Sequence, residues 1–142
     1  MKIKTSELEG SALDWAVAKA LGWRVTHVPA DANGENAGEV LAPPTVKDGE
    51  WVFPPKGRIG PRYFLKNWSS DWGQGGPMIA SRRVMLEPLT RMDHPEGGWH
   101  AGFKDRIGVM HGPSPLIAAM RAIVAAELGD EVDVPDELEK DA

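Results

Sequence analysis

The sequence predicts an α+β protein with a small, mostly antiparallel sheet and two helices packed on it. Two segments, about residues 11–21 and 115–128, carry apolar residues at helical spacing. Several short segments elsewhere are apolar or alternate between apolar and polar residues, which is typical of strands. Glycine and proline together make up 28 of the 142 residues, so much of the chain must be turn and loop. These observations favour one compact α+β domain over residues 1–142.

The first third of the chain predicts a strand, a helix and a second strand. Residues 2–5 alternate between polar and apolar and indicate a short strand. Ser11 and Asp14 stand three residues apart, as in a capping box, and predict the start of a helix. Gly22 is the expected C-terminal stop of this helix. Residues 23–28 then change to a period of two, which predicts a strand.

A long irregular connection over residues 29–60 follows, with one strand candidate at 51–53. Connections of this length in compact domains are more often functional or mobile than neutral. Further strand candidates lie at 78–80, 84–87, 99–103 and 107–110. Ser114 is the expected N-cap of the last helix, with Pro115 at its first position and Gly129 at its end.

The composition is that of a soluble globular protein, with 42% hydrophobic and 26% charged residues. There is no cysteine, which excludes disulfides and thiolate chemistry. No apolar run approaches the roughly 20 residues that cross a bilayer, and the N-terminus lacks the apolar stretch of a signal peptide. We therefore expect a cytoplasmic protein with no membrane partner.

Charge is unevenly distributed along the chain. The acidic tail, residues 130–142, carries a net charge of −6, and the rest of the chain sums to +1. Residues 56–106 are mildly basic, at +4. This balance suits a small anionic ligand but is too weak for a duplex-DNA binder. Within the tail, Val132 and Val134 alternate with charges, so we expect them to dock on the core.

The segment 68–77 and the arginines after it form the candidate ligand site. Tryptophan faces stack on bases or other rings, polar side chains read the edge of such a ring, and glycines expose backbone N–H groups. Paired arginines bind phosphate in a bidentate manner. The same segment fits equally well a tight turn whose tryptophans fill the core. The candidate residues are Trp68, Ser70, Asp71, Trp72, Gln74, Gly75, Gly76, Arg82 and Arg83.

Arg121 completes the candidate site, because it lies in an otherwise apolar and alanine-rich helix. It either points into the site or, the favoured reading, extends its charged end to solvent. The four histidines have no metalloprotease spacing, so we expect no metal. No nucleophile elbow, phosphate loop or dinucleotide fingerprint occurs, which leaves no support for catalysis and predicts no cofactor.

Three blocks of sequence together resemble a known family. They cover residues 4–8 with 13–20, residues 71–77, and residues 112–121 with 128–132. The chain resembles the NinX-like proteins of tailed phages, found in the nin region of lambda-like genomes. The family's motif falls on Trp15, Asp71, Trp72, Gln74, Gly75, Gly76, Pro77, Pro113, Pro115 and Arg121. The resemblance implies a phage origin and a host-cytoplasm setting, but no established activity, since the family is known as uncharacterised.

The leading functional hypothesis is a phage protein that binds, without catalysis, a small anionic nucleotide-like signal of host immunity and so sequesters it. Such sites often form between subunits, so we expect a homo-oligomer. The alternative is a protein-interaction module that inhibits or redirects a host or phage protein, with tryptophans as hot spots. A single-strand-binding role is weakened by the net negative charge.

Overall fold

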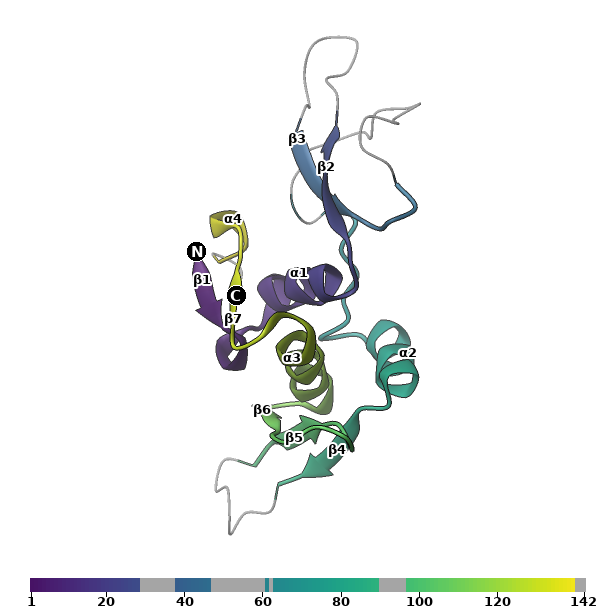
Figure 1. The fold of residues 1–142 in the computed structure, drawn as a ribbon, viewed down its shortest axis with the longest axis vertical. Coiled ribbons are helices and arrows are strands. Elements are labelled where there is room, and N and C mark those ends of the chain that lie inside the picture. The colour runs from purple at the N-terminus through teal and green to yellow at the C-terminus, as the bar shows by residue number, and fades with distance from the viewer. Residues whose placement is uncertain (29–37, 47–60, 62, 90–96, 140–142) are drawn as a thin grey trace.

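The computed structural model describes residues 1–28, 38–46, 61, 63–89 and 97–139. Two helices, α1 (Gly10–Ala20) and α3 (Pro115–Leu128), pack on each other at the centre of the molecule. Around them the described residues form three small antiparallel sheets, rather than the one sheet expected. Figure 1 shows the pair of strands β2 and β3 extending from one end of this body, and the sheet of β4, β5 and β6 at the other. The predicted α+β class is confirmed.

The two predicted helices are confirmed, but only the second has the predicted cap. Ser114 Oγ accepts a hydrogen bond from Ile117 N at 3.1 Å and begins α3. Helix α1 instead begins one residue early, with Glu9 as N-cap and no side-chain capping bond. The predicted capping box of Ser11 and Asp14 is therefore wrong. Asp14 is buried and binds a distant turn, because α1 turns it inward.

Strands β1 (Lys2–Lys4) and β7 (Glu131–Asp133) join the two ends of the chain. A short 3₁₀ turn (Thr5–Glu7) follows β1, and Thr5 Oγ1 donates to Gly129 O at 2.6 Å. After β7 comes the single-turn helix α4 (Asp136–Glu139). The expected docking of Val132 and Val134 is confirmed, since both are buried. Leu138 is buried with them, so most of the acidic tail forms part of the fold.

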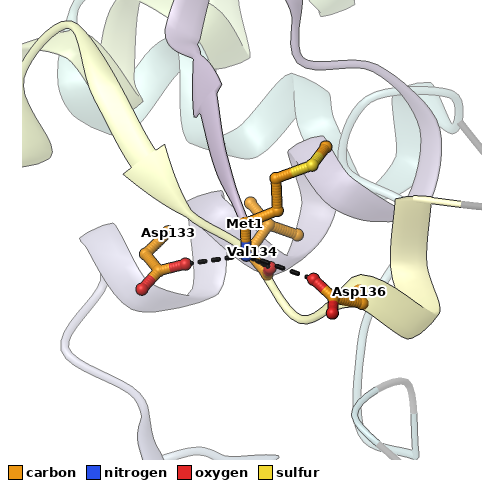
Figure 2. Close-up of polar contacts among 4 residues, drawn as sticks. All are labelled: Met1, Asp133, Val134 and Asp136. Carbon is orange, nitrogen blue, oxygen red and sulfur yellow. Dashed lines mark hydrogen bonds and ion pairs between the residues drawn. The ribbon is translucent and has the colours of Figure 1, made fainter.

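The N-terminal amine of Met1 contacts residues 133–136 of the acidic tail (Figure 2). It donates to Val134 O at 2.8 Å and pairs with the carboxylates of Asp133 at 2.9 Å and Asp136 at 3.3 Å. The Asp133 carboxylate raises the pKa of the amine above its ordinary 8.0. The amine in turn lowers the pKa of Asp133 below its ordinary 3.8. Both groups are exposed, so the pair makes a modest contribution to stability.

The stabilisation from this ion pair is expected to be confined to a pH window. The amine contributes fully below pH 8.0 and loses its contribution as the pH rises through its raised pKa. Asp133 contributes above 3.8 and loses its contribution as the pH falls through its lowered pKa. Asp133→Asn should therefore lower the melting temperature most at about pH 5–7 and less at either extreme. Glu137→Gln, on the exposed surface of α4, is the control; an equal loss at every pH would contradict the assignment.

Strands β2 (Arg24–Val28) and β3 (Gly38–Ala42) form a two-stranded ribbon. Strand β3 lies inside the segment predicted as an irregular connection over residues 29–60, so that prediction is wrong for residues 38–42. Val40 and Ala42 pack with Val28, and Phe64 packs against this small cluster. Val40, Leu41 and Ala42 are all buried, and this packing explains the strand despite the glycines that precede it in sequence. The strand candidate at 51–53 lies outside the described residues.

The third sheet places β5 (Trp99–Gly102) between β4 (Met85–Pro88) and β6 (Met110–Gly112). Its inward residues, among them Leu86 and Ala101, join the core around α3. The predicted strand at 107–110 is displaced, because Ile107 and Val109 are exposed and β6 begins only at Met110. No helix in the described ranges is long and apolar enough to cross a membrane.

Candidate functional site

The segment predicted as a glycine-rich loop is largely a helix, α2 (Trp72–Arg82), which packs against α3. The predicted strand at 78–80 is therefore also wrong. Glycine and an internal proline, Pro77, both disfavour a helix, so local propensity argued for a turn. Tertiary packing overrides it at Gly75, which is buried. A β-carbon there would overlap the carbonyl oxygen of Trp68 and lie 2.7 Å from Leu116 Cδ2.

The turn before α2 contains Trp68 and Ser69, and both contact residues of the core. Trp68 is buried, and its ring meets Trp23 edge-on with ring centroids 5.4 Å apart. Ser69 N donates to Asp14 Oδ1 on α1 at 2.9 Å. In this chain the ring of Trp68 thus fills the core, as the structural alternative for this segment predicted.

Two of the predicted ligand-reading side chains hold the start of α2. Asp71 is its N-cap, and its Oδ1 accepts a hydrogen bond from Gly73 N at 2.8 Å. Gln74 Oε1 accepts one from Asn67 N. Ser70, which directly precedes Asp71, is exposed. The N-cap pattern at Asp71 was the sequence signal for the helix, since Asp is among the preferred N-cap residues.

Trp72 is the exposed aromatic residue of the predicted site. Its side chain is 56% exposed, whereas the other described tryptophans, at 15, 23, 68 and 99, are buried or partly buried. A β-carbon at Gly76, one turn further on, would lie 3.7 Å from Trp72 Cε3. The ring therefore lies along the helix, with Gly76 beneath it and solvent above.

The predicted phosphate-binding arginines lie at the other end of α2. Arg82 pairs with Glu127 of α3 at 3.4 Å. Arg83 ends the helix in the left-handed conformation, with φ of 54°, and is exposed. From Asp71 to Arg83 the helix spans about 18 Å at 1.5 Å per residue. In one copy of the chain, the predicted stacking and phosphate-binding groups are thus well separated.

Arg121 does not extend to solvent, so the favoured reading of this residue is wrong. It is 7% exposed, and its Nε donates to Leu8 O at 2.8 Å and its Nη1 to His111 O at 3.0 Å. Burial lowers the pKa of this guanidinium, and the charge of Glu9 opposes that shift. The two backbone carbonyls give the buried side chain partners that solvent would otherwise supply. Arg121 therefore joins the segments of Leu8 and His111 to α3.

Arg82 also lines a hollow that sequence reasoning missed. This hollow, about 190 Å³, lies between α2, α3 and the segment after β5. A neighbouring hollow of about 340 Å³ shares Phe103, Arg106 and Ala126 with it and extends under Ile107 and Val109. Arg106 Nη1 donates to Ala126 O at 3.1 Å. Nothing in the local sequence singles out Arg106 beyond the basic balance of residues 56–106.

Asp14, which anchors the turn beneath the site, is a buried acid with a shifted pKa. Burial raises its pKa above the ordinary 3.8, and the backbone and side-chain hydrogen bonds from Ser69 partly oppose this shift. The folded state therefore binds this proton more readily than the unfolded state does. Stability should fall as the pH rises from 3.8 through the raised pKa.

Two substitutions at Asp14 separate its charge from its hydrogen bond. Asp14→Asn keeps an oxygen for Ser69 N and should abolish that pH-dependent loss. Asp14→Ala leaves a buried N–H without its acceptor and should cost about 1–3 kcal/mol of unfolding free energy. Urea unfolding at several pH values measures both. If the free energy of unfolding of Asp14→Asn depends on pH as that of the parent does, another group causes this dependence.

These features describe a small α+β protein whose helix α2 presents an exposed tryptophan at one end and two arginines at the other. A family model described as Bacteriophage P22, NinX matches residues 4–127. The match covers most of the 142 residues, so the chain belongs to this family of phage proteins, as its sequence resemblance indicated. No curated protein matches the chain significantly.

Proposed function

We propose that this phage protein binds a small anionic, nucleotide-like molecule without converting it, and so withholds an immune signal in the host cytoplasm. The single observation that carries the proposal is Trp72. A large aromatic side chain that is 56% exposed is the exception among the described tryptophans. An indole face open to solvent can stack on a base, which is worth roughly 1–3 kcal/mol.

The arginines at the C-terminal end of α2 supply the anion-binding part of the proposal. Arg83 is exposed, and Arg82 lines the 190 Å³ hollow that Arg106 also lines. Guanidinium groups bind phosphate in a bidentate geometry that a lysine cannot reproduce. Glu127 lines the same hollow and pairs with Arg82 at 3.4 Å, so a bound phosphate must replace this carboxylate as the partner of Arg82.

Native mass spectrometry with a panel of nucleotides tests the proposal. The protein is measured before and after addition of ATP, NAD and a 3′,3′-linked cyclic dinucleotide. We expect a stoichiometric mass shift with one class, and binding at least about tenfold weaker in Trp72→Ala, the loss of roughly 1.4 kcal/mol of stacking. Val25→Ala, a change at an apolar residue that is 45% exposed in β2, should bind normally. Binding that is unchanged in Trp72→Ala would remove Trp72 from the site, and no shift with any class would overturn the proposal.

A second candidate, a protein-interaction module, is favoured by one separate surface. Ile107 is fully exposed and Val109 is 58% exposed, and both border the 340 Å³ hollow. Exposed aliphatic side chains beside a hollow are typical of a partner-binding surface. If this surface mediates the function, the double variant Ile107→Ser and Val109→Ser should lose the protein's effect on phage infection in cells. The same variant should still bind the nucleotide as the parent does.

A further inference from the structure

The outer face of α2 consists of small residues and carries no charge between its ends. Gly75, on the inner face, meets Trp68 and Leu116. The opposite face consists of small residues, Gly73, Gly76, Pro77 and Ala80, with Trp72 at its border. Figure 1 shows α2 at the edge of the molecule, on the far side of α3 from β1 and β7. Residues 72–81 contain no Asp, Glu, Lys or Arg.

The ends of this face have opposite charge. Asp71 stands immediately before the helix, and the exposed Arg83 stands at its end, whereas Arg82 faces Glu127 of α3. We propose that two copies of the chain pair through this face, with their α2 helices antiparallel about a two-fold axis. In that arrangement Asp71 of each copy lies opposite Arg83 of the other, and the axis passes near Pro77, midway between them. A parallel pairing would instead bring like charges together at both ends.

The side chains on this face permit such an approach. Packed helices lie about 8–10 Å apart, at the lower end of that range where the residues between them are small. The residues that meet near the axis, Gly76 and Pro77, have little or no side chain to separate the helices. Trp72 then reaches the C-terminal end of the second helix, where its ring face can receive a guanidinium group. An isologous contact of this kind closes as a dimer.

The pairing also brings together the groups that one chain keeps about 18 Å apart. Trp72 and Ser70 of one copy meet Arg83 of the other, once at each end of the paired helices. Each dimer thus holds two composite sites, with a stacking surface from one copy and phosphate-binding groups from its partner. The use of these sites for a nucleotide rests on the proposed function, whereas the pairing rests on α2 alone.

Engineered cysteines test the geometry, because the chain has no cysteine of its own. Pro77→Cys, near the axis, should form a disulfide-linked dimer at least about tenfold faster than Thr45→Cys, at an exposed position off α2. Gly73→Cys and Ser81→Cys should each link slowly with themselves and faster when mixed, as antiparallel helices require. Equal rates at 77 and 45, or fast self-linking at 73, would overturn the antiparallel pairing.

A charge on the face tests the pairing without a crosslink. Ala80→Arg adds a good helix former at an exposed position and should keep the circular dichroism spectrum of the parent. In native mass spectra we expect it to be a monomer where the parent and Thr45→Arg are dimers. A monomeric parent across micromolar concentrations, or an Ala80→Arg protein that remains a dimer, would overturn the proposal.

Mixed dimers test the composite site. Trp72→Ala and Arg83→Gly each disable both sites of their own dimers, and the glycine suits the left-handed backbone. A refolded mixture of the two should regain about a quarter of the parent's nucleotide sites, since half of its dimers hold one intact site. No recovery, with the parent binding the same nucleotide, would overturn the composite site. A dimer that binds none of the nucleotides would sink the proposed function and leave the pairing in place.

Discussion

Gly75→Ala is expected to destabilise the protein by about 2–3 kcal/mol and to detach α2 from the turn before it. The added methyl group would overlap the carbonyl oxygen of Trp68, and it would lie 2.7 Å from Leu116 Cδ2. A backbone carbonyl cannot move aside as the end of a flexible side chain can. Relief therefore requires α2 to shift away from α3, which opens the core around Trp68. Urea unfolding, with tryptophan fluorescence as the signal, measures the loss.

Gly76→Ala is the matched control, one residue further along the same helix. Its methyl group would lie 3.7 Å from Trp72 Cε3, which is an ordinary contact. Since alanine is the better helix former by about 1 kcal/mol, this variant should be as stable as the parent or slightly more stable. A similar loss in both variants would show that the glycines serve backbone freedom rather than close packing, and would contradict the structure at Gly75.

The sequence predicted the central helices because their signals are local and agree with their packing. Ser114 and Gly129 bound α3 as their residue types predict, and its apolar face is the core. Helix α2 was missed because its glycines and Pro77 disfavour a helix locally, and the contact that compensates comes from Trp68 and Leu116. Contacts between residues far apart in sequence leave no periodic signal.

For the candidate site, the sequence indicates suitable residue types but not where their side chains lie. Trp72 and Arg83 are exposed, as ligand-binding groups must be, and single residues of this kind can be recognised by type. Their separation follows from the helix that was missed. The inward direction of Trp68 and Arg121 depends on the core that surrounds them, and a tryptophan or an arginine in sequence is compatible with either direction. Arg106 is a candidate residue because it lines a hollow that only the folded chain creates.

Arg121→Ala is expected to cost about 3–5 kcal/mol of unfolding free energy. The guanidinium bridges two segments that flank α3, through Nε to Leu8 O at 2.8 Å and through Nη1 to His111 O at 3.0 Å. The side chain is 7% exposed. Alanine removes both donors, so two carbonyls lose their partners, and it leaves a cavity of most of an arginine side chain. With a total stability of about 5–15 kcal/mol, such a loss brings a domain near unfolding.

Two further variants separate the bridging role of Arg121 from its charge. Arg121→Lys keeps the charge, but a single ammonium cannot reproduce the two directions of the guanidinium fork, so it should still lose about 1–3 kcal/mol. Arg106→Ala is the control, because Arg106 is exposed and also donates to a backbone carbonyl, that of Ala126 at 3.1 Å. It should cost less than about 1 kcal/mol, since water replaces the lost donor. Equal losses at 106 and 121 would mean that burial does not set the cost, and a full rescue by lysine would mean that charge alone suffices. The difference expected between the two arginines follows from burial, because the Arg121 side chain is 7% exposed and its bond to Leu8 O is buried, whereas Arg106 is exposed.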